Sequence, residues 1–475
     1  MSTDATRAAS AVGGRWSGLG GQTGLLAAGY LVRSVGALAL TVLLGRLLGP
    51  EGFGQVTVFL AVSWGAFYIA ASWVLVSIPA LSPGREGAAL DGQVFWSALL
   101  LGLGGTLLAT TVLLAVLVAA GGGVERVLPR STWPAVAITA LALLVLNALY
   151  AALQALKRAG GVALLQALER FFALALAAVT VLALGGGVNG AVWALAAAAV
   201  ATALLGALGS GVRERVGRPA VTRVALRRAT RFSGPLAVSN VAAYLVAWVD
   251  ILILAAFLEP AEVGVYSVAY QFFALLLGLA GVWVLAAVPD YVQRRRDSPV
   301  QLRIGPLTNA SALWSAVVAV GGTAAVAMFG VLFGDEFRSG AGVAAVLLAA
   351  AALLAPYFAV VPVLIAAGRT RALMWISVGG AATNVIVDLA LVQSLGIWAA
   401  AIGTVAQTVL VTAAIVLLEF GGRALAQVGM AVLPGVAALA VLAADPHSAV
   451  ATALAGCVAC FALVATGLRF RRTLA

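Results

Sequence analysis

Long apolar runs alternate with short polar segments along the whole chain. Most of these runs exceed the roughly 20 residues that an α-helix needs to cross a hydrocarbon core of about 30 Å. The pattern therefore predicts an all-α membrane protein that crosses the bilayer about fourteen times. The predicted spans are 22–48, 54–80, 93–120, 134–156, 161–185, 188–210, 232–258, 263–289, 307–333, 341–367, 372–394, 397–420, 428–444 and 448–468.

The composition agrees with this pattern and excludes a water-soluble protein. Hydrophobic residues make up 63% of the 475 residues and charged residues only 9%, whereas a soluble domain carries roughly 25% charged residues. Because so little charge cannot cover a globule of this size, most of the surface must face lipid. The polar first 21 residues lack the short apolar core of a cleavable signal peptide.

The basic residues indicate the topology. With the N-terminus in the cytoplasm, about 22 of the 28 Lys and Arg fall in inside segments, and only Arg46, Arg126, Arg130 and Arg338 fall in outside ones. Every second loop is basic without a break, which predicts an even number of spans and two cytoplasmic termini. The net charge of +11 is scattered between apolar runs, so no nucleic-acid partner is expected.

One basic segment, 211–231, divides the spans into six and eight. It is predicted to be a cytoplasmic linker close to anionic lipid headgroups. The expected organisation is a cytoplasmic tail at 1–21, an N-lobe of six spans at 22–210, the linker, a C-lobe of six spans at 232–420, and a final hairpin with the cytoplasmic C-terminus at 421–475.

The two lobes show traces of an internal repeat. Residues 48–54 read Leu-Gly-Pro-Glu-Gly-Phe-Gly and residues 258–264 read Leu-Glu-Pro-Ala-Glu-Val-Gly, at an offset of about 210. Similar offsets relate the chain at 155–158 to 366–369 and Gly187 to Gly396. Because six spans separate the copies, both insert with the same orientation. Such a parallel repeat places a cavity between two lobes related by an axis along the membrane normal.

The motifs of this repeat resemble a known family. Residues 45–54, Gly-Arg-Leu-Leu-Gly-Pro-Glu-Gly-Phe-Gly, are similar to the first-hairpin signature of bacterial polysaccharide and oligosaccharide-lipid flippases. So are Asp250 and residues 263–270, Val-Gly-Val-Tyr-Ser-Val-Ala-Tyr. These flippases belong to the multidrug/oligosaccharidyl-lipid/polysaccharide exporter superfamily. The resemblance implies two six-helix lobes in the plasma membrane and undecaprenyl-diphosphate-linked sugars as substrate.

No enzyme site is predicted. The only histidine, His447, lies in an expected outer loop, and the two cysteines give no metal or redox set. A Ser-His-Asp set inside the membrane is therefore excluded, and no Walker-type Gly-Lys-Ser/Thr loop occurs. No cofactor or metal is expected, apart from a sodium ion or a proton as the coupling ion.

Arg33 is the most informative charge inside a span. It lies about 11 residues into the first span, which at about 1.5 Å per residue is roughly 16 Å deep. An arginine at the helix centre costs about 2.5–3.5 kcal/mol on insertion scales. It therefore needs an anionic ligand, such as the diphosphate of a lipid-linked sugar, or an acidic partner such as Asp250 or Asp388.

Further charges lie in later spans. Glu169 and Arg170 are adjacent in span five, so their side chains should point about 100° apart. Each is expected to find its own partner, or one of them lies near the cytoplasmic rim. Arg170 is a second candidate for substrate binding. Asp250 and Asp388, with Asn384 one turn before Asp388, could hold a sodium ion or exchange a proton, or pair with an arginine.

The remaining candidates are polar or proline residues. Arg46 is expected at the outer end of span one, either near the substrate exit or as an interface anchor. Asn240 and Tyr244, four residues apart in span seven, suit a polar cavity face or an interface. Pro356 and Pro362 interrupt span ten and predict a double kink that serves as a hinge or as a static bend.

The leading hypothesis is a flippase for lipid-linked oligosaccharide that works by alternating access. Its expected partners are the lipid-linked substrate, membrane lipids and proteins of polysaccharide polymerisation and assembly. One alternative is an ion-coupled drug or metabolite antiporter of the same superfamily. Another is a non-transporting scaffold in a polysaccharide assembly complex.

Overall fold

The computed structural model describes residues 3–81, 90–119, 127–297, 304–367 and 369–474. Arg85, Arg126 and Arg303 of the predicted charge pattern lie outside these residues. Within the described ranges every regular element is a helix, as the sequence predicts. The helices are α1 (Thr3–Phe67), η1 (Tyr68–Ser72), α2 (Trp73–Leu75), α3 (Ser77–Leu81), α4 (Gly92–Ala119), η2 (Arg130–Thr132), α6 (Trp133–Ala155), α7 (Ala159–Ala178), η3 (Val179–Ala183), α8 (Gly187–Gly209), α9 (Val212–Val216), α10 (Arg223–Phe257), α11 (Pro260–Asp297), α12 (Ile304–Ala327), α13 (Phe329–Phe333), η4 (Asp335–Phe337), α14 (Gly340–Leu353), α15 (Ala355–Ala366), α16 (Thr370–Leu395), α17 (Ile397–Phe420), α18 (Gly422–Ala444) and α19 (Ala449–Leu474).

The described residues contain 12 helices long and apolar enough to cross a membrane, or 13 if the bent pair α14–α15 is one span. The first, Ala28–Leu81, is 54 residues long, which corresponds to about 81 Å at about 1.5 Å per residue. That is far more than one bilayer. The backbone breaks at Gly49, which has φ 67° and ψ −177° and precedes Pro50. The predicted number of fourteen is reached only when the two arms of this stretch are counted separately.

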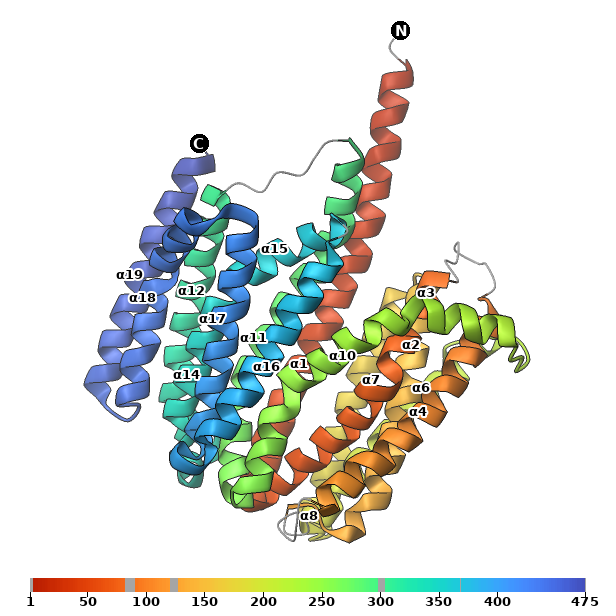
Figure 1. Ribbon diagram of the computed structural model, residues 1–475, viewed down its shortest axis with the longest axis horizontal. Coiled ribbons are helices and arrows are strands. Elements are labelled where there is room, and N and C mark those ends of the chain that lie inside the picture. Colours follow the sequence, from red (N-terminus) through yellow and green to blue (C-terminus); the bar gives the residue numbers. More distant parts are fainter. Residues whose placement is uncertain (1–2, 82–89, 120–126, 298–303, 368, 475) are drawn as a thin grey trace.

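The helices before α9 pack with one another, and so do those after α10. In the first half α1 packs against α4, α6, α7 and α8. In the second half α14 packs against α11, α12 and α17, and α16 packs against α17. The last two helices, α18 and α19, pack against α12 and each other. The start of α1 and the end of α19 lie at the same end of the molecule (Figure 1), as an even number of crossings requires.

The predicted linker is only partly a loop. α9 occupies its first part, and α10 begins at Arg223 rather than near residue 232. The reason is local, because the side chain of Thr222 caps α10 by accepting a hydrogen bond from the amide of Ala225 at 3.2 Å. α10 then passes between the halves and contacts α4 on one side and α16 on the other.

The two copies of the Pro-Gly motif meet at the contact between α1 and α11. A Cβ added at Gly54 would lie 2.0 Å from the carbonyl oxygen of Pro260, and one added at Gly264 would lie 1.9 Å from that of Pro50. Each copy therefore places its glycine against the proline carbonyl of the other. The contact is reciprocal, which is the geometry of a pseudo-two-fold axis, and both glycines are needed because any side chain would overlap backbone.

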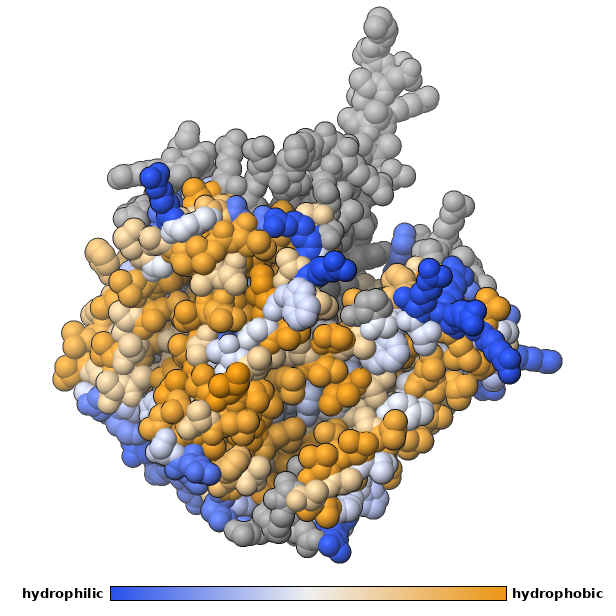
Figure 2. Space-filling view, viewed as in Figure 1, coloured by the Kyte–Doolittle hydropathy of each residue, from blue (hydrophilic) through white to orange (hydrophobic). Residues whose placement is uncertain are grey.

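The outer surface is largely apolar. Large side chains such as Leu184, Leu208 and Phe461 are more than 70% exposed. Figure 2 shows a hydrophobic face with hydrophilic residues gathered toward its two ends. A surface of this kind is stable only against lipid, as the composition predicts.

We expect Gly264→Val to disrupt the junction between the halves. The new side chain would overlap the Pro50 backbone, so the melting temperature should fall by an amount equivalent to at least the roughly 1–3 kcal/mol typical of overpacking. Gly429→Val in α18 is the matched control, because a Cβ there has nothing within 4 Å. Equal melting temperatures of the two purified variants would contradict this reading of the contact.

Candidate functional site

Buried charges gather in two clusters, one in each half. The first, which we call the N-cluster, consists of Arg33 on α1 and Glu169 and Arg170 on α7. The second, the C-cluster, surrounds two carboxylates and consists of Asp250 on α10, Tyr266 on α11, Asn384 and Asp388 on α16, and Thr404 and Gln407 on α17. Because buried charge is costly in an apolar interior, each cluster needs a specific source of compensation.

The N-cluster forms where α7 comes close to α1. Gly36 permits this approach, since a Cβ there would lie 2.9 Å from the Cβ of Arg170. A terminal nitrogen of Arg170 lies 3.7 Å from Oε1 of Glu169. The hydroxyl of Tyr150 on α6 donates to Oε2 of Glu169 over 3.4 Å. Glu169 is only 7% exposed, and the Nε of Arg170 is buried without an acceptor.

The contact between Glu169 and Arg170 corrects one sequence expectation. Adjacent helical residues do point apart, but the long arginine side chain bridges the difference and the two groups form an ion pair. Glu169 was not among the predicted site residues. Its signal was present in the sequence, as a carboxylate inside an apolar run that also contains an arginine.

Arg33 does not form the ion pair with Asp250 or Asp388 that the sequence allowed. Among the described residues no carboxylate lies within 4.0 Å of its guanidinium, whose Cζ lies 5.6 Å from the ring centroid of Trp64. It is close enough to Glu169 and Arg170 for electrostatic interaction with both. Arg33 is partly exposed and retains donors for a ligand.

Three other predicted substrate residues lie apart from the N-cluster. Arg46 donates from Nε to the carbonyl of Leu332 at 2.8 Å, and from a terminal nitrogen to that of Val331. It thus caps α13 and links the halves. Tyr244 is buried, and its hydroxyl donates to the carbonyl of Ala61 at 3.0 Å. Its hydrogen is therefore not available to a substrate. Asn240 lies one turn earlier on α10 and is partly exposed.

Asp250 is the centre of the C-cluster. The hydroxyl of Tyr266 on α11 donates to its Oδ2 at 2.5 Å, and that of Thr404 donates to the same atom at 3.1 Å. The side-chain amide of Asn384 donates to its Oδ1. Asp250 is 2% exposed and Asp388 1%. The structure thus brings together all three predicted ion-coupling residues.

Asp388 lies beside Asp250 and packs against Gly403, where a Cβ would lie 2.0 Å from its Oδ1. Among the described atoms, both carboxylate oxygens of Asp388, Oδ1 of Asn384 and Oε1 of Gln407 are buried without a donor. Buried polar atoms are normally satisfied, and two neighbouring carboxylates repel each other. A bound monovalent cation or proton would resolve both problems, because alkali and alkaline-earth cations take oxygen ligands.

Sequence reasoning missed Tyr266, Thr404 and Gln407 in the C-cluster. Hydroxyl and amide residues are common in membrane helices, and only the packing of α10, α11, α16 and α17 shows which of them meet. The described residues include no group of three or more His, Cys, Asp or Glu that could hold a metal ion.

Span ten, which contains both prolines, is divided into two helices by one bend. α14 and α15 meet at 40°, and Pro356 lies in the first turn of α15, whereas Pro362 lies inside that helix. Side chains from other helices satisfy carbonyls at the bend. Trp314 Nε1 donates to Ala351 at 2.9 Å, and the hydroxyl of Thr412 donates to Leu353 at 3.1 Å. The predicted kink at Pro362 and the hinge role of both prolines stay predictions.

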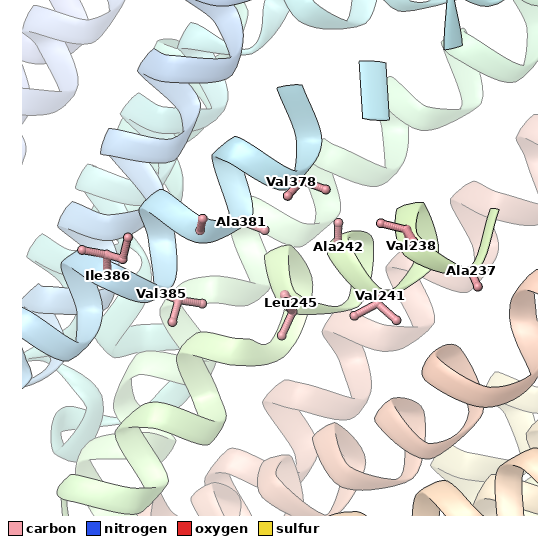
Figure 3. A pocket seen from close by; sticks show the side chains of 10 residues that line it. Ala237, Val238, Val241, Ala242, Leu245, Val378, Ala381, Val385 and Ile386 are labelled. Atoms are coloured by element: carbon pink, nitrogen blue, oxygen red, sulfur yellow. The ribbon is translucent and has the colours of Figure 1, made fainter. Parts of the chain in front are cut away.

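A groove between α10 and α16 is lined only by aliphatic side chains, from Ala237 to Leu245 on one helix and Val378 to Ile386 on the other (Figure 3). Its volume is about 590 Å³. No polar group lines it, so it can accept hydrocarbon but offers nothing to a sugar or a diphosphate.

Comparison with known proteins relates this chain to a family and to solved structures. A sequence profile of the family described as "Polysaccharide biosynthesis protein" matches residues 21–293, more than half of the chain. A search of curated proteins gives no significant match.

Solved structures share the fold. The lipid II flippase MurJ in an inward closed conformation matches with a TM-score of 0.68 and 11% identity over 95% of this chain and 99% of that one. The eukaryotic MATE transporter AtDTX14 matches with a TM-score of 0.54 and 16% identity over 88% and 98%. The Vibrio cholerae MATE transporter VcmN in its bent form matches with a TM-score of 0.55 and 15% identity over 87% and 99%.

The helical fold and the matching family define a multi-pass membrane transporter of the multidrug/oligosaccharidyl-lipid/polysaccharide exporter superfamily. Within the superfamily, the chain belongs to the polysaccharide biosynthesis protein family.

Proposed function

We propose that this protein moves undecaprenyl-diphosphate-linked oligosaccharide from the inner to the outer leaflet by alternating access of its two halves. The observation that carries the proposal is the N-cluster, in which two arginines from two helices lie near a single carboxylate, and only Arg170 forms an ion pair with it. Their two positive charges exceed the one negative charge that Glu169 contributes. An anionic headgroup provides the missing charge.

The chemistry of the arginines suits a diphosphate. A guanidinium offers a planar fork of donors that matches two phosphate oxygens, and its charge persists at any physiological pH. Arg33 has no carboxylate partner, and the Nε of Arg170 has no acceptor. Phosphate oxygens would supply these acceptors, while the sugar would occupy the cavity that the repeat predicts between the halves and the polyprenyl chain would stay in lipid.

The comparisons support a lipid-linked substrate. The family is described by polysaccharide biosynthesis, and a solved structure of the same fold is a flippase of lipid II. A drug antiporter would need a cavity that attracts organic cations, whereas the N-cluster is cationic. A scaffold would need no charged groups inside the membrane. We further propose the bacterial plasma membrane as location, cytoplasmic termini, and polysaccharide polymerase or assembly proteins as partners.

We assign ion coupling to the C-cluster. Asp250 already receives three hydrogen bonds, whereas the buried oxygens of Asp388, Asn384 and Gln407 receive none. These oxygens, contributed by α16 and α17, suit a sodium ion or a proton. Because α10 carries Asp250 and also contacts the first half, cation binding here can bias how the halves pack.

Arg33→Ala and Arg170→Ala should each abolish or strongly reduce polymer export in cells whose surface polysaccharide depends on this protein. Loss of one charge-assisted contact removes about 1.5–3 kcal/mol, which corresponds to a fall of at least about tenfold. Arg423→Ala, an exposed arginine in α18, is the control for expression and should export normally. Intact export by both cluster variants at equal protein levels would rule out the binding role.

Sodium should raise the melting temperature of the purified protein relative to choline at equal ionic strength. A ligand at about 100 times its Kd adds about 2.7 kcal/mol to the folded state. Asp388→Asn should lose this response, and the exposed Asp335→Asn should keep it. A stabilisation by acid pH in place of sodium, lost in Asp388→Asn, would assign a proton; a response to neither cation would contradict the coupling role.

A further inference from the structure

Glu169 has no part in the proposed function as stated above, yet it occupies the centre of the N-cluster. It is the single carboxylate there among the described residues, 3.7 Å from the Arg170 guanidinium and 3.4 Å from the Tyr150 hydroxyl. Any diphosphate that binds Arg33 and Arg170 must therefore share them with Glu169.

The titratable groups near Glu169 lie on α7 itself and on two of the helices that pack against it. They are Arg170 on α7 itself, Arg33 on α1 and Tyr150 on α6. Arg33 interacts in turn with Tyr30 on α1 and Tyr68 on η1. α8 and η3 also pack against α7, and neither contains a titratable residue. Two guanidinium groups and one carboxylate leave the cluster with a single net positive charge.

A sugar linked through a diphosphate is a diester with two negative charges. Its binding beside two arginines and an ionised Glu169 would leave one uncompensated negative charge in a mostly buried site. An isolated buried charge is much more costly than a neutral hydrogen-bonded group. If Glu169 gains a proton, the two arginines and the diphosphate balance, and the bound site is neutral.

The geometry allows this exchange. The contact between Glu169 and Arg170 is long for a charge-assisted hydrogen bond, which is typically about 2.7–2.9 Å, so the carboxylate does not hold the guanidinium tightly. A protonated Glu169 becomes a donor, and the oxygen of Tyr150 is already within 3.4 Å to accept from it. The released guanidinium can then direct its donors to phosphate oxygens.

We infer that Glu169 is a built-in counter-ion which the anionic headgroup displaces, with uptake of one proton from water for each headgroup bound. The proton returns to water when the headgroup leaves and Glu169 pairs with Arg170 again. Binding therefore tightens as the pH falls through the range in which the proton is taken up. This inference rests on the proposed function, because it assumes a diphosphate ligand at the arginines.

The test measures binding of a short polyprenyl-diphosphate-linked N-acetylglucosamine to the full-length protein in lipid nanodiscs. The probe is a diester, so its own charge is constant between about pH 5 and pH 8. One linked proton tightens the Kd by up to about tenfold for each unit fall in pH. Calorimetry at one pH in two buffers of different ionisation enthalpy should count one proton taken up.

Glu169→Gln is the decisive variant, since it keeps a side chain that can bond to Tyr150 but carries no charge. It should bind the probe about as tightly as the wild type does at low pH, with a Kd independent of pH and no proton uptake. Glu419→Gln is the matched control, because Glu419 pairs with Arg369 away from the N-cluster. Its pH dependence should equal that of the wild type.

The outcomes separate this inference from the proposed function. Wild-type binding with a constant Kd and no proton uptake would overturn the role of Glu169 and leave the flippase proposal standing. Unchanged pH dependence in Glu169→Gln would do the same. A folded wild type that binds no probe at any pH would overturn the flippase proposal and this inference together. The calorimetric count uses the wild type alone, so it decides even if the variant does not fold.

Discussion

The structure depends on how the charged side chains inside its membrane-spanning helices are compensated. An arginine or a carboxylate in the middle of a bilayer persists only with a partner or a wet cavity, and the chain solves this problem twice. In the N-cluster the positive charge is in excess and Glu169 offsets part of it. In the C-cluster the negative charge is in excess, with Asp250 and Asp388 side by side. One site is therefore suited to an anion and the other to a cation.

The junction of the halves sets the distance between these sites. Gly54 and Gly264 each lie against a proline carbonyl of the other half. The two copies of one short motif therefore meet just after the break at Gly49 in α1 and at the start of α11. Arg33 lies on the other arm of α1 beyond Gly49, and Asp250 lies on α10 shortly before the second copy. A change in either cluster can thus alter the angle of helices that meet at the same contact.

Much of this arrangement could be predicted from the sequence, because hydrophobic length, loop charge and the repeat each obey simple rules. The spans, an arginine inside the first span and the placement of Asn384 and Asp388 on one helix face follow from them. Contacts between distant helices could not be predicted, since they depend on rotations that a single sequence does not define. The hydrogen bond from Asn384 on α16 to Asp250 on α10 and that from Tyr150 on α6 to Glu169 on α7 are of this kind. So are the hydroxyl and amide groups of the C-cluster, which are Tyr266, Thr404 and Gln407.

The central claim is that the cationic N-cluster holds a lipid-linked diphosphate while it crosses the membrane. The most direct measurement is movement of a fluorescent polyprenyl-diphosphate-linked sugar between the leaflets of liposomes that contain the purified protein, with sodium and pH gradients imposed in turn. The account predicts transfer by the wild type under at least one gradient and none by Arg33→Ala. Absence of transfer by the folded wild type under every gradient, or equal transfer by Arg33→Ala, would contradict it.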